Sequence, residues 1–184
     1  MVAMHPLKVP IYKQLRDDNS CGPQVILMVA DYFAEARGRK LYAHEWSEVL
    51  KTTMSNDLAG DDGTSWRDLR AGLRMIGLGS KKLKGGLSGF RSSLGRGLPV
   101  IVYCTIPYKK QGVGHYAVLV GMNGSTMLFA DPFPHKPMRK DGLREVPWSE
   151  FKSKKWSEGQ VVWGDLRWSI EVFCAPRRSN PQVV

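Results

Sequence analysis

The chain has 184 residues, of which 42% are apolar and 24% charged, and this composition is ordinary for one globular domain. Its longest apolar run, Val25–Ala30, is far shorter than the roughly 18 residues of a membrane span, and the N-terminus lacks a Sec-type signal. We therefore expect a protein that is cytoplasmic at synthesis or exported by a route without such a signal. The net charge of +10 predicts contact with anionic polymers, but its basic residues form short scattered clusters and no nucleic-acid motif, so nucleic acid is an unfavoured partner.

The first half of the chain is predicted to be helical. Residues 21–36 contain no helix breaker after Pro23, and their middle is apolar on almost every side, which predicts a helix that begins at Cys21 and passes through the core. A loop rich in Gly and Asp is expected over residues 56–63. Further helices are expected at Ala43–Thr53, at Trp66–Ile76 with Thr64 or Ser65 as its cap, and at Ser88–Leu94.

The second half is predicted to form a sheet. Asn123-Gly124-Ser125 is a strong hairpin signal, and a glycine-containing loop is expected over residues 109–114. The sequence thus predicts one α+β domain over residues 1–176, its helical N-terminal half packed on a C-terminal antiparallel sheet with the active site between them, and a polar tail over residues 177–184. Expected strands are Pro99–Ile106, His115–Met122, Thr126–Ala130 and Trp168–Cys174, with a short helix at Pro147–Lys154.

Three scattered cysteines, Cys21, Cys104 and Cys174, are too few for a disulfide framework, and none forms a CxxC pair typical of zinc. We expect no metal and no cofactor. Cys21 stands at a predicted helix start, where unsatisfied N–H groups and the helix dipole stabilise a thiolate, and the flanking Gly22 and Pro23 fit that geometry. The alternative is a buried cysteine that packs as a small apolar residue.

His115 begins a predicted strand, which gives an imidazole the rigidity that a general base needs. If the following turn has three residues, His115 lies opposite Phe133 and Asp131 becomes its diagonal neighbour on the same face. A two-residue turn would separate the two side chains unless a bulge restored the register. Gln14, seven residues before Cys21, is a candidate for holding an oxyanion. The alternatives are a structural histidine, a turn aspartate and a surface glutamine.

Together these motifs resemble the double-glycine, bacteriocin-leader-processing branch of the papain-like cysteine peptidases. The resemblance covers roughly residues 10–175, and the segments that carry it are Gln14, Ser20-Cys21-Gly22-Pro23, Gly63-Thr64, Gly77-Leu78, residues 94–100, Gly114–Gly121 and Ala130-Asp131-Pro132. It implies a papain-like cysteine protease fold with Cys21, His115, Asp131 and Gln14 as catalytic residues. Two positions depart from the family pattern: Ser20 replaces the usual aspartate, and Gln14 lies one residue further from Cys21.

The leading hypothesis is a cysteine hydrolase that cleaves a peptide or isopeptide bond of a peptide or protein substrate through a Cys-His-Asp triad and an acyl-enzyme. The alternatives are a glutamine deamidase or acyl transferase, a cell-wall peptide hydrolase, and an inactive basic binding module. The chain has no membrane span or ATP-binding P-loop, so the resemblance implies a stand-alone form without a transporter. Leu83-Lys84-Gly85-Gly86 resembles a double-glycine cleavage signal, but we interpret it as a simple turn.

Overall fold

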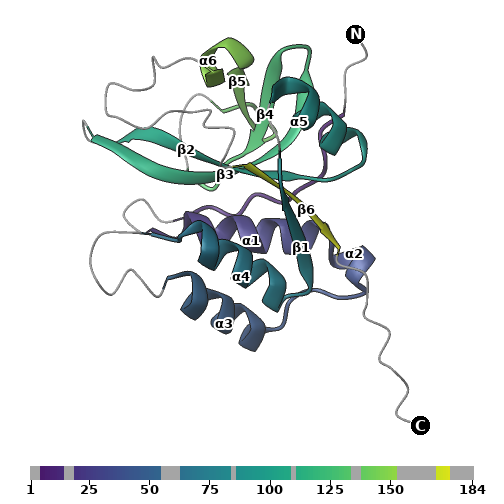
Figure 1. Ribbon diagram of the computed structural model, residues 1–184, viewed down its shortest axis with the longest axis vertical. Coiled ribbons are helices and arrows are strands. Elements are labelled where there is room, and N and C mark those ends of the chain that lie inside the picture. The colour runs from purple at the N-terminus through teal and green to yellow at the C-terminus, as the bar shows by residue number, and fades with distance from the viewer. Residues whose placement is uncertain are drawn as a thin grey trace.

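The fold is a six-stranded antiparallel sheet with helices on both faces, as Figure 1 shows. The structure is a computed structural model and describes residues 5–14, 19–54, 63–83, 86–108, 111–133, 138–152 and 169–174. Its helices are α1 (Cys21–Tyr32), α2 (Ala34–Arg37), α3 (Ala43–Thr53), α4 (Trp66–Met75), α5 (Gly86–Gly95) and α6 (Trp148–Lys152). Its strands are β1 (Leu78–Lys82), β2 (Val100–Tyr108), β3 (Gln111–Asn123), β4 (Thr126–Ala130), β5 (Arg144–Pro147) and β6 (Ser169–Cys174), in the spatial order β1-β6-β2-β3-β4-β5.

The sheet separates two hydrophobic clusters. The larger cluster lies between the sheet and α1, α3 and α4, and the smaller cluster packs α5 and α6 against the opposite face of β2, β3 and β4. Helix α1 supplies several side chains that are fully buried in the larger cluster: Val25, Ile26, Met28 and Val29. The expectation of an α1 helix that runs through the core is therefore confirmed. The helix also fixes the position of Cys21, because a rod packed along its length cannot shift its first residue independently.

Most predicted helices are present with small changes at their ends. The helix expected over residues 21–36 is interrupted at Phe33, so that α2 follows α1 as a separate short turn. The α3 boundaries match the prediction, and Ser65 caps α4 by accepting a hydrogen bond from the backbone N–H of Asp68 at 3.1 Å. Helix α5 begins at Gly86, two residues before the predicted Ser88. No helix within the described ranges is long and apolar enough to cross a membrane.

Two strands, β1 and β5, were not predicted from the sequence, and one predicted loop is wrong. Strands β1 and β5 are short and carry many polar residues, so that they become strands through pairing with β6 and β4. Residues 111–114, expected in a loop, instead belong to β3 and pair with β2, so His115 lies inside a long strand and does not begin it. Most of the expected 56–63 loop, residues 153–168 and the expected 177–184 tail lie outside the described residues.

The β3–β4 hairpin turn differs from the prediction. The turn has two residues, Gly124 and Ser125, because Asn123 pairs with Thr126. The register then shifts between Leu119 and Gly121, where Val120 forms a one-residue bulge. Beyond the bulge, Val118 pairs with Ala130, which is the register that a three-residue turn would have produced. The expectation of a three-residue turn is wrong, but the bulge restores the register on which the site depends.

The N-terminal segment, residues 6–14, links the hairpin to α1. The Leu7 N–H donates to the carbonyl of the bulged Val120 at 2.8 Å, which satisfies a group that the sheet ladder leaves free. Tyr12 donates its hydroxyl hydrogen to Asp31 on α1 at 2.5 Å, and this bond raises the pKa of the tyrosine to about 12. The Gln14 N–H donates to the Pro132 carbonyl at 2.9 Å. The segment therefore crosses the boundary between helices and sheet and ends beside Asp131.

Candidate active site

Cys21 is the first residue of α1, and only 7% of its surface is exposed. The first backbone hydrogen bond of the helix runs from the Gln24 N–H to the Ser20 carbonyl at 2.9 Å. The N–H groups of the first turn before Gln24 have no partner within the helix and point toward its N-terminal end. These N–H groups and the helix dipole favour negative charge on a sulfur at this position.

Gly22 is required by close packing at this helix start. A Cβ atom at Gly22 would lie 2.0 Å from Thr64 Oγ1 and 2.3 Å from Thr64 Cβ. Thr64 is buried, and its carbonyl accepts a hydrogen bond from the Tyr116 hydroxyl at 2.8 Å, so its backbone is anchored. Glycine therefore allows the segment before α4 to pack directly against the residue that follows Cys21.

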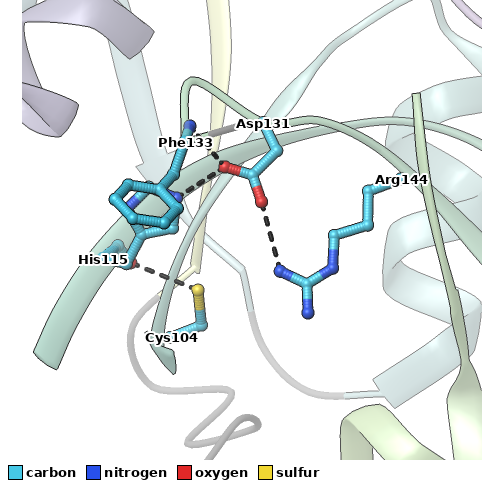
Figure 2. Close-up of polar contacts among 5 residues, drawn as sticks. All are labelled: Cys104, His115, Asp131, Phe133 and Arg144. Atoms are coloured by element: carbon cyan, nitrogen blue, oxygen red, sulfur yellow. Dashed lines mark hydrogen bonds and ion pairs between the residues drawn. The ribbon is translucent and has the colours of Figure 1, made fainter. Parts of the chain in front are cut away.

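His115 and Asp131 form a buried ion pair that joins β3 to the end of β4. His115 Nε2 lies 2.6 Å from Asp131 Oδ1, and each residue is 1% exposed. Figure 2 shows the imidazole and the carboxylate pointing toward each other. Because Nε2 faces the carboxylate, Nδ1 is the ring nitrogen left for another partner. The bulge-corrected hairpin thus brings together the two residues that the sequence analysis paired.

Asp131 has two further polar partners in the structure. Its Oδ1 also accepts a hydrogen bond from the Phe133 N–H at 2.9 Å, and its Oδ2 lies 3.2 Å from Nη1 of Arg144 (Figure 2). Burial alone would raise the pKa of this carboxyl, but the positive charges of His115 and Arg144 and the Phe133 N–H outweigh burial and hold the pKa below its usual value. Asp131 is therefore an ionised carboxylate in a buried setting.

Cys21 interacts with the same imidazole, so that the thiol, the His115 ring and the Asp131 carboxylate form a series of three polar side chains. Burial lowers the pKa of the imidazole, but the negative charge and hydrogen bond of Asp131, together with the hydrogen bond and charge of Cys21, raise it from 6.5 to about 10. At neutral pH the imidazole therefore carries a proton. A cationic imidazole beside a thiol at a helix N-terminus is the setting that favours a thiolate.

Cys104, the β2 residue paired with His115, lies next to the same group but differs from Cys21 in its chemistry. Its thiol is fully buried and donates a hydrogen bond to the His115 carbonyl at 3.3 Å. Burial is the largest cause that raises its pKa well above the ordinary value, so it is a neutral thiol. Cys104 supports the β3 backbone at the histidine. None of the three cysteines forms a disulfide.

Gln14 is 8% exposed and lies beside Pro132, to which its backbone N–H is bonded. The structure therefore places it next to the Asp131 loop, on the segment that links β3 to α1. Arg144 was not predicted as a site residue, although its place in the sequence carries a signal. In the run Arg144-Glu-Val-Pro147 burial alternates, and Arg144 occupies the same inward face as Val146. An arginine on the apolar face of a short strand is a recognisable pointer to a buried carboxylate.

Among the described residues, no group of three or more His, Cys, Asp or Glu side chains is arranged to hold a metal ion. The side chains that meet at the site are a thiol, an imidazole and a carboxylate in series. Such a series suits nucleophilic attack on a carbonyl carbon.

Solved structures with a similar fold are peptidase domains. In structure the chain is similar to the peptidase domain of Streptococcus ComA, a bifunctional ABC transporter involved in quorum sensing, with 19% identity, a TM-score of 0.58, and coverage of 92% of this chain and 99% of that one. It is also similar to a C39-like peptidase from Bacillus anthracis, with 13% identity, a TM-score of 0.56, and coverage of 94% and 98%.

A third similar structure is a double glycine motif protease from an AMS/PCAT transporter, solved in complex with the leader peptide. It shows 18% identity, a TM-score of 0.51, and coverage of 91% of both chains. These likenesses show the papain-like peptidase fold that the sequence predicted. Among curated proteins, no sequence match was found. The model of the Peptidase_C39 like family matches residues 6–160. This chain therefore belongs to the Peptidase_C39 like family of cysteine peptidases.

Proposed function

We propose that this protein is a thiol peptidase that cleaves a peptide or isopeptide bond, with Cys21 as nucleophile, His115 as acid and base, and Asp131 as the residue that orients the imidazole. The observation that carries the proposal is the buried His115–Asp131 pair, in which Nε2 lies 2.6 Å from the carboxylate, together with the buried Cys21 at the start of α1, which interacts with the same imidazole. A structural histidine would not need a nucleophile at a helix N-terminus as its second partner.

The reaction begins from a Cys21 thiolate and a protonated His115. The sulfur forms a bond to the substrate carbonyl carbon, and the electron pair of the C=O bond moves to oxygen. The Cys21 backbone N–H and the Gln14 side-chain amide hold this oxyanion. Support for the role of Gln14 is its burial and its backbone bond to Pro132, next to Asp131. When the oxyanion collapses, the C–N bond breaks and His115 gives its proton to the leaving amine.

The second half of the reaction releases the acyl group from sulfur. The now neutral His115 takes a proton from water, and the resulting hydroxide attacks the thioester carbonyl. Collapse of this second oxyanion breaks the C–S bond, which frees the acid product and restores the thiolate beside a protonated imidazole. Asp131 keeps the ring in place throughout, because its Oδ1 stays bonded to Nε2 while the other ring nitrogen exchanges the proton.

The substrate class that the comparisons favour is a peptide. One similar structure is described as a double glycine motif protease in complex with a leader peptide, which supports a peptide main chain as the group in the site. The net charge of +10 supports a second candidate, a peptide attached to an anionic cell-wall polymer. Both substrates present an amide carbonyl to the same thiol, so the chemistry at Cys21 is shared.

A substrate-profile assay tests the proposal. Purified protein is incubated with peptide libraries that include double-glycine leaders, with isopeptides and with murein peptides, and new amino termini are detected by mass spectrometry. The matched variants are Cys21→Ala and Cys174→Ala, because Cys174 is a half-buried cysteine on β6. We expect turnover by the wild-type and Cys174→Ala proteins and none by Cys21→Ala.

The same preparations are treated with iodoacetamide, and each cysteine is followed by its own tryptic peptide. Faster alkylation of Cys21 than of Cys174 is expected from a thiolate at a helix start. The peptidase proposal is wrong if Cys21 is alkylated no faster than Cys174 and the Cys21→Ala variant keeps whatever turnover the wild-type protein shows. Release of ammonia from glutamine side chains without chain cleavage would instead identify a deamidase.

A further inference from the structure

Arg144 lies on the side of Asp131 that faces away from the imidazole. Its Nη1 is 3.2 Å from Asp131 Oδ2, while Oδ1 is occupied by His115 and the Phe133 N–H. Figure 2 shows the guanidinium and the imidazole approaching the carboxylate from different directions. The arginine side chain is 10% exposed, although arginine is among the residues least often buried without a partner.

The fold explains how an arginine reaches this point. Arg144 is the first residue of β5 and pairs with Phe129 on β4, and Asp131 lies two residues beyond Phe129. The two charged residues are therefore diagonal neighbours across β4 and β5, as His115 and Asp131 are across β3 and β4. Asp131 thus receives one cationic partner from each strand that flanks β4.

The ion pair between Arg144 and Asp131 matters because of the charges that the proposed reaction places in the buried site. A thiolate, a protonated imidazole and a carboxylate together carry a single net negative charge, and burial of uncompensated charge is costly. The Arg144 guanidinium makes the series neutral. The series remains neutral in the acyl-enzyme, in which the sulfur is acylated, the imidazole has given up its proton and the carboxylate still faces the guanidinium.

We infer that Arg144 is a positioning residue of this site: it holds the Asp131 carboxylate in place and supplies the buried positive charge that balances the charges of Cys21, His115 and Asp131 in the proposed reaction. This inference rests on the proposed function. Without Arg144, the buried site regains neutrality most simply by taking up a proton, and the thiolate is the group whose protonation leaves the His115–Asp131 ion pair intact.

Among the described residues, the other titratable groups near the series do not supply this charge. The Cys104 thiol on β2 interacts with Asp131 and Cys21 and is neutral, because burial raises its pKa. The Tyr116 hydroxyl on β3 interacts with Cys21 and is also neutral, because burial raises its pKa strongly, and Asp68 on α4 adds a negative charge near that tyrosine. In the part of the chain that the structure describes, His115 and Arg144 are the cations that interact with Asp131, and Arg144 keeps its charge through the proposed reaction.

The test is the pH dependence of Cys21 alkylation by iodoacetamide, which needs no substrate. It compares wild type with Arg144→Gln, Arg144→Lys and Arg139→Gln, the last being an exposed arginine of the same region that pairs with Asp141 and Glu145. We expect Arg144→Gln to move the acidic limb of the rate profile to higher pH by about one pH unit. Arg144→Lys keeps the positive charge, so we expect the acidic limb of its profile to coincide with that of wild type. The same is expected for Arg139→Gln.

The outcomes separate this inference from the proposed function. If wild-type Cys21 shows no enhanced alkylation, the proposed function fails first. Suppose that Cys21 is reactive in wild type. The inference about Arg144 is then overturned if the acidic limb of the alkylation profile does not shift in folded Arg144→Gln. It is also overturned if the limb shifts as far in Arg144→Lys as in Arg144→Gln. Should Arg144→Gln fail to fold, the same substitution is made in Asp131→Asn, whose neutral amide needs no cation. In the double variant, the acidic limb of the alkylation profile must lie at higher pH than in Asp131→Asn alone. If the two profiles have the same acidic limb, the inference is rejected.

Discussion

The two sides of the site are built in different ways. Cys21 is placed by local structure, because a helix that starts at residue 21 and is buried along its length fixes the thiol at the helix N-terminus. His115 and Asp131 are placed by pairing between β3 and β4, and their register depends on the bulge at Val120. The position of the nucleophile therefore follows from a short stretch of chain, whereas the position of the base depends on the geometry of the whole hairpin.

The largest expected effect comes from breaking the sheet side with Asp131→Asn. The amide no longer holds a charged imidazole, and we expect turnover to fall by roughly 1,000-fold or more, as when the orienting carboxylate of a triad is lost. Asp131 raises the pKa of His115 to about 10, so the alkaline limb of the wild-type rate profile should fall near that value and move to lower pH in the variant. A pH–rate profile measures both, and an unmoved alkaline limb would contradict the assignment.

The same ion pair has a defined effect on stability. The pKa of His115 is raised above its ordinary value of 6.5, so its contribution is complete below pH 6.5 and is lost as pH rises through about 10. The pKa of Asp131 is lowered from 3.8, so its contribution is present above pH 3.8 and is lost as pH falls below that value. Thermal unfolding from pH 4 to 10 should therefore show a smaller wild-type advantage over Asp131→Asn toward alkaline pH.

Breaking the helix side with Gly22→Ala should have the next largest effect. The new Cβ would meet Thr64 at 2.0 Å, and the Tyr116 bond limits how far Thr64 can move. We expect a loss of about 1–3 kcal/mol in the free energy of unfolding from overpacking, and a drop in turnover of roughly 100-fold from displacement of the thiol. Gly63→Ala is the matched control, because its Cβ would meet ordinary contacts no closer than 3.6 Å. Equal effects of the two substitutions on unfolding and turnover would contradict the packing argument.

The smallest expected effect tests the link between the two sides. In Gly121→Ala the new Cβ would lie 2.9 Å from the Pro6 Cα atom, next to the Leu7–Val120 hydrogen bond. We expect chemical denaturation to show a loss of about 1 kcal/mol, and turnover to fall only a few-fold because β3 and β4 keep their register. Gly124→Ala is an unsuitable control, since its φ of 58° would add backbone strain of its own. A proteolysis assay should instead show earlier cleavage of the N-terminal segment, and unchanged protection would contradict the proposed link.

Much of the fold was predictable where local signals are strong. The α3 and α4 helices follow from amphipathic periodicity, and the Ser65 cap follows from residue type. The signals failed for β1 and β5, since a strand such as Leu-Gly-Ser-Lys-Lys has little preference of its own and acquires its structure from a partner far along the chain. The turn prediction failed for a related reason. The number of residues in the turn and the extra residue of the bulge together set the strand register, and the register decides which side chains share a face.

The sequence by itself determined the helix that begins at Cys21, the change from helices to sheet near residue 98, and the pairing of His115 with Asp131 as a hypothesis. Those features follow from residue type and periodicity, which act within a few turns or one hairpin. Tertiary structure alone decided that a bulge would set the register, that the N-terminal segment would bring Gln14 beside Pro132, and that Arg144 would reach the far oxygen of Asp131. Each of these depends on contacts between distant segments, whose geometry exists only after the sheet and helices have packed together.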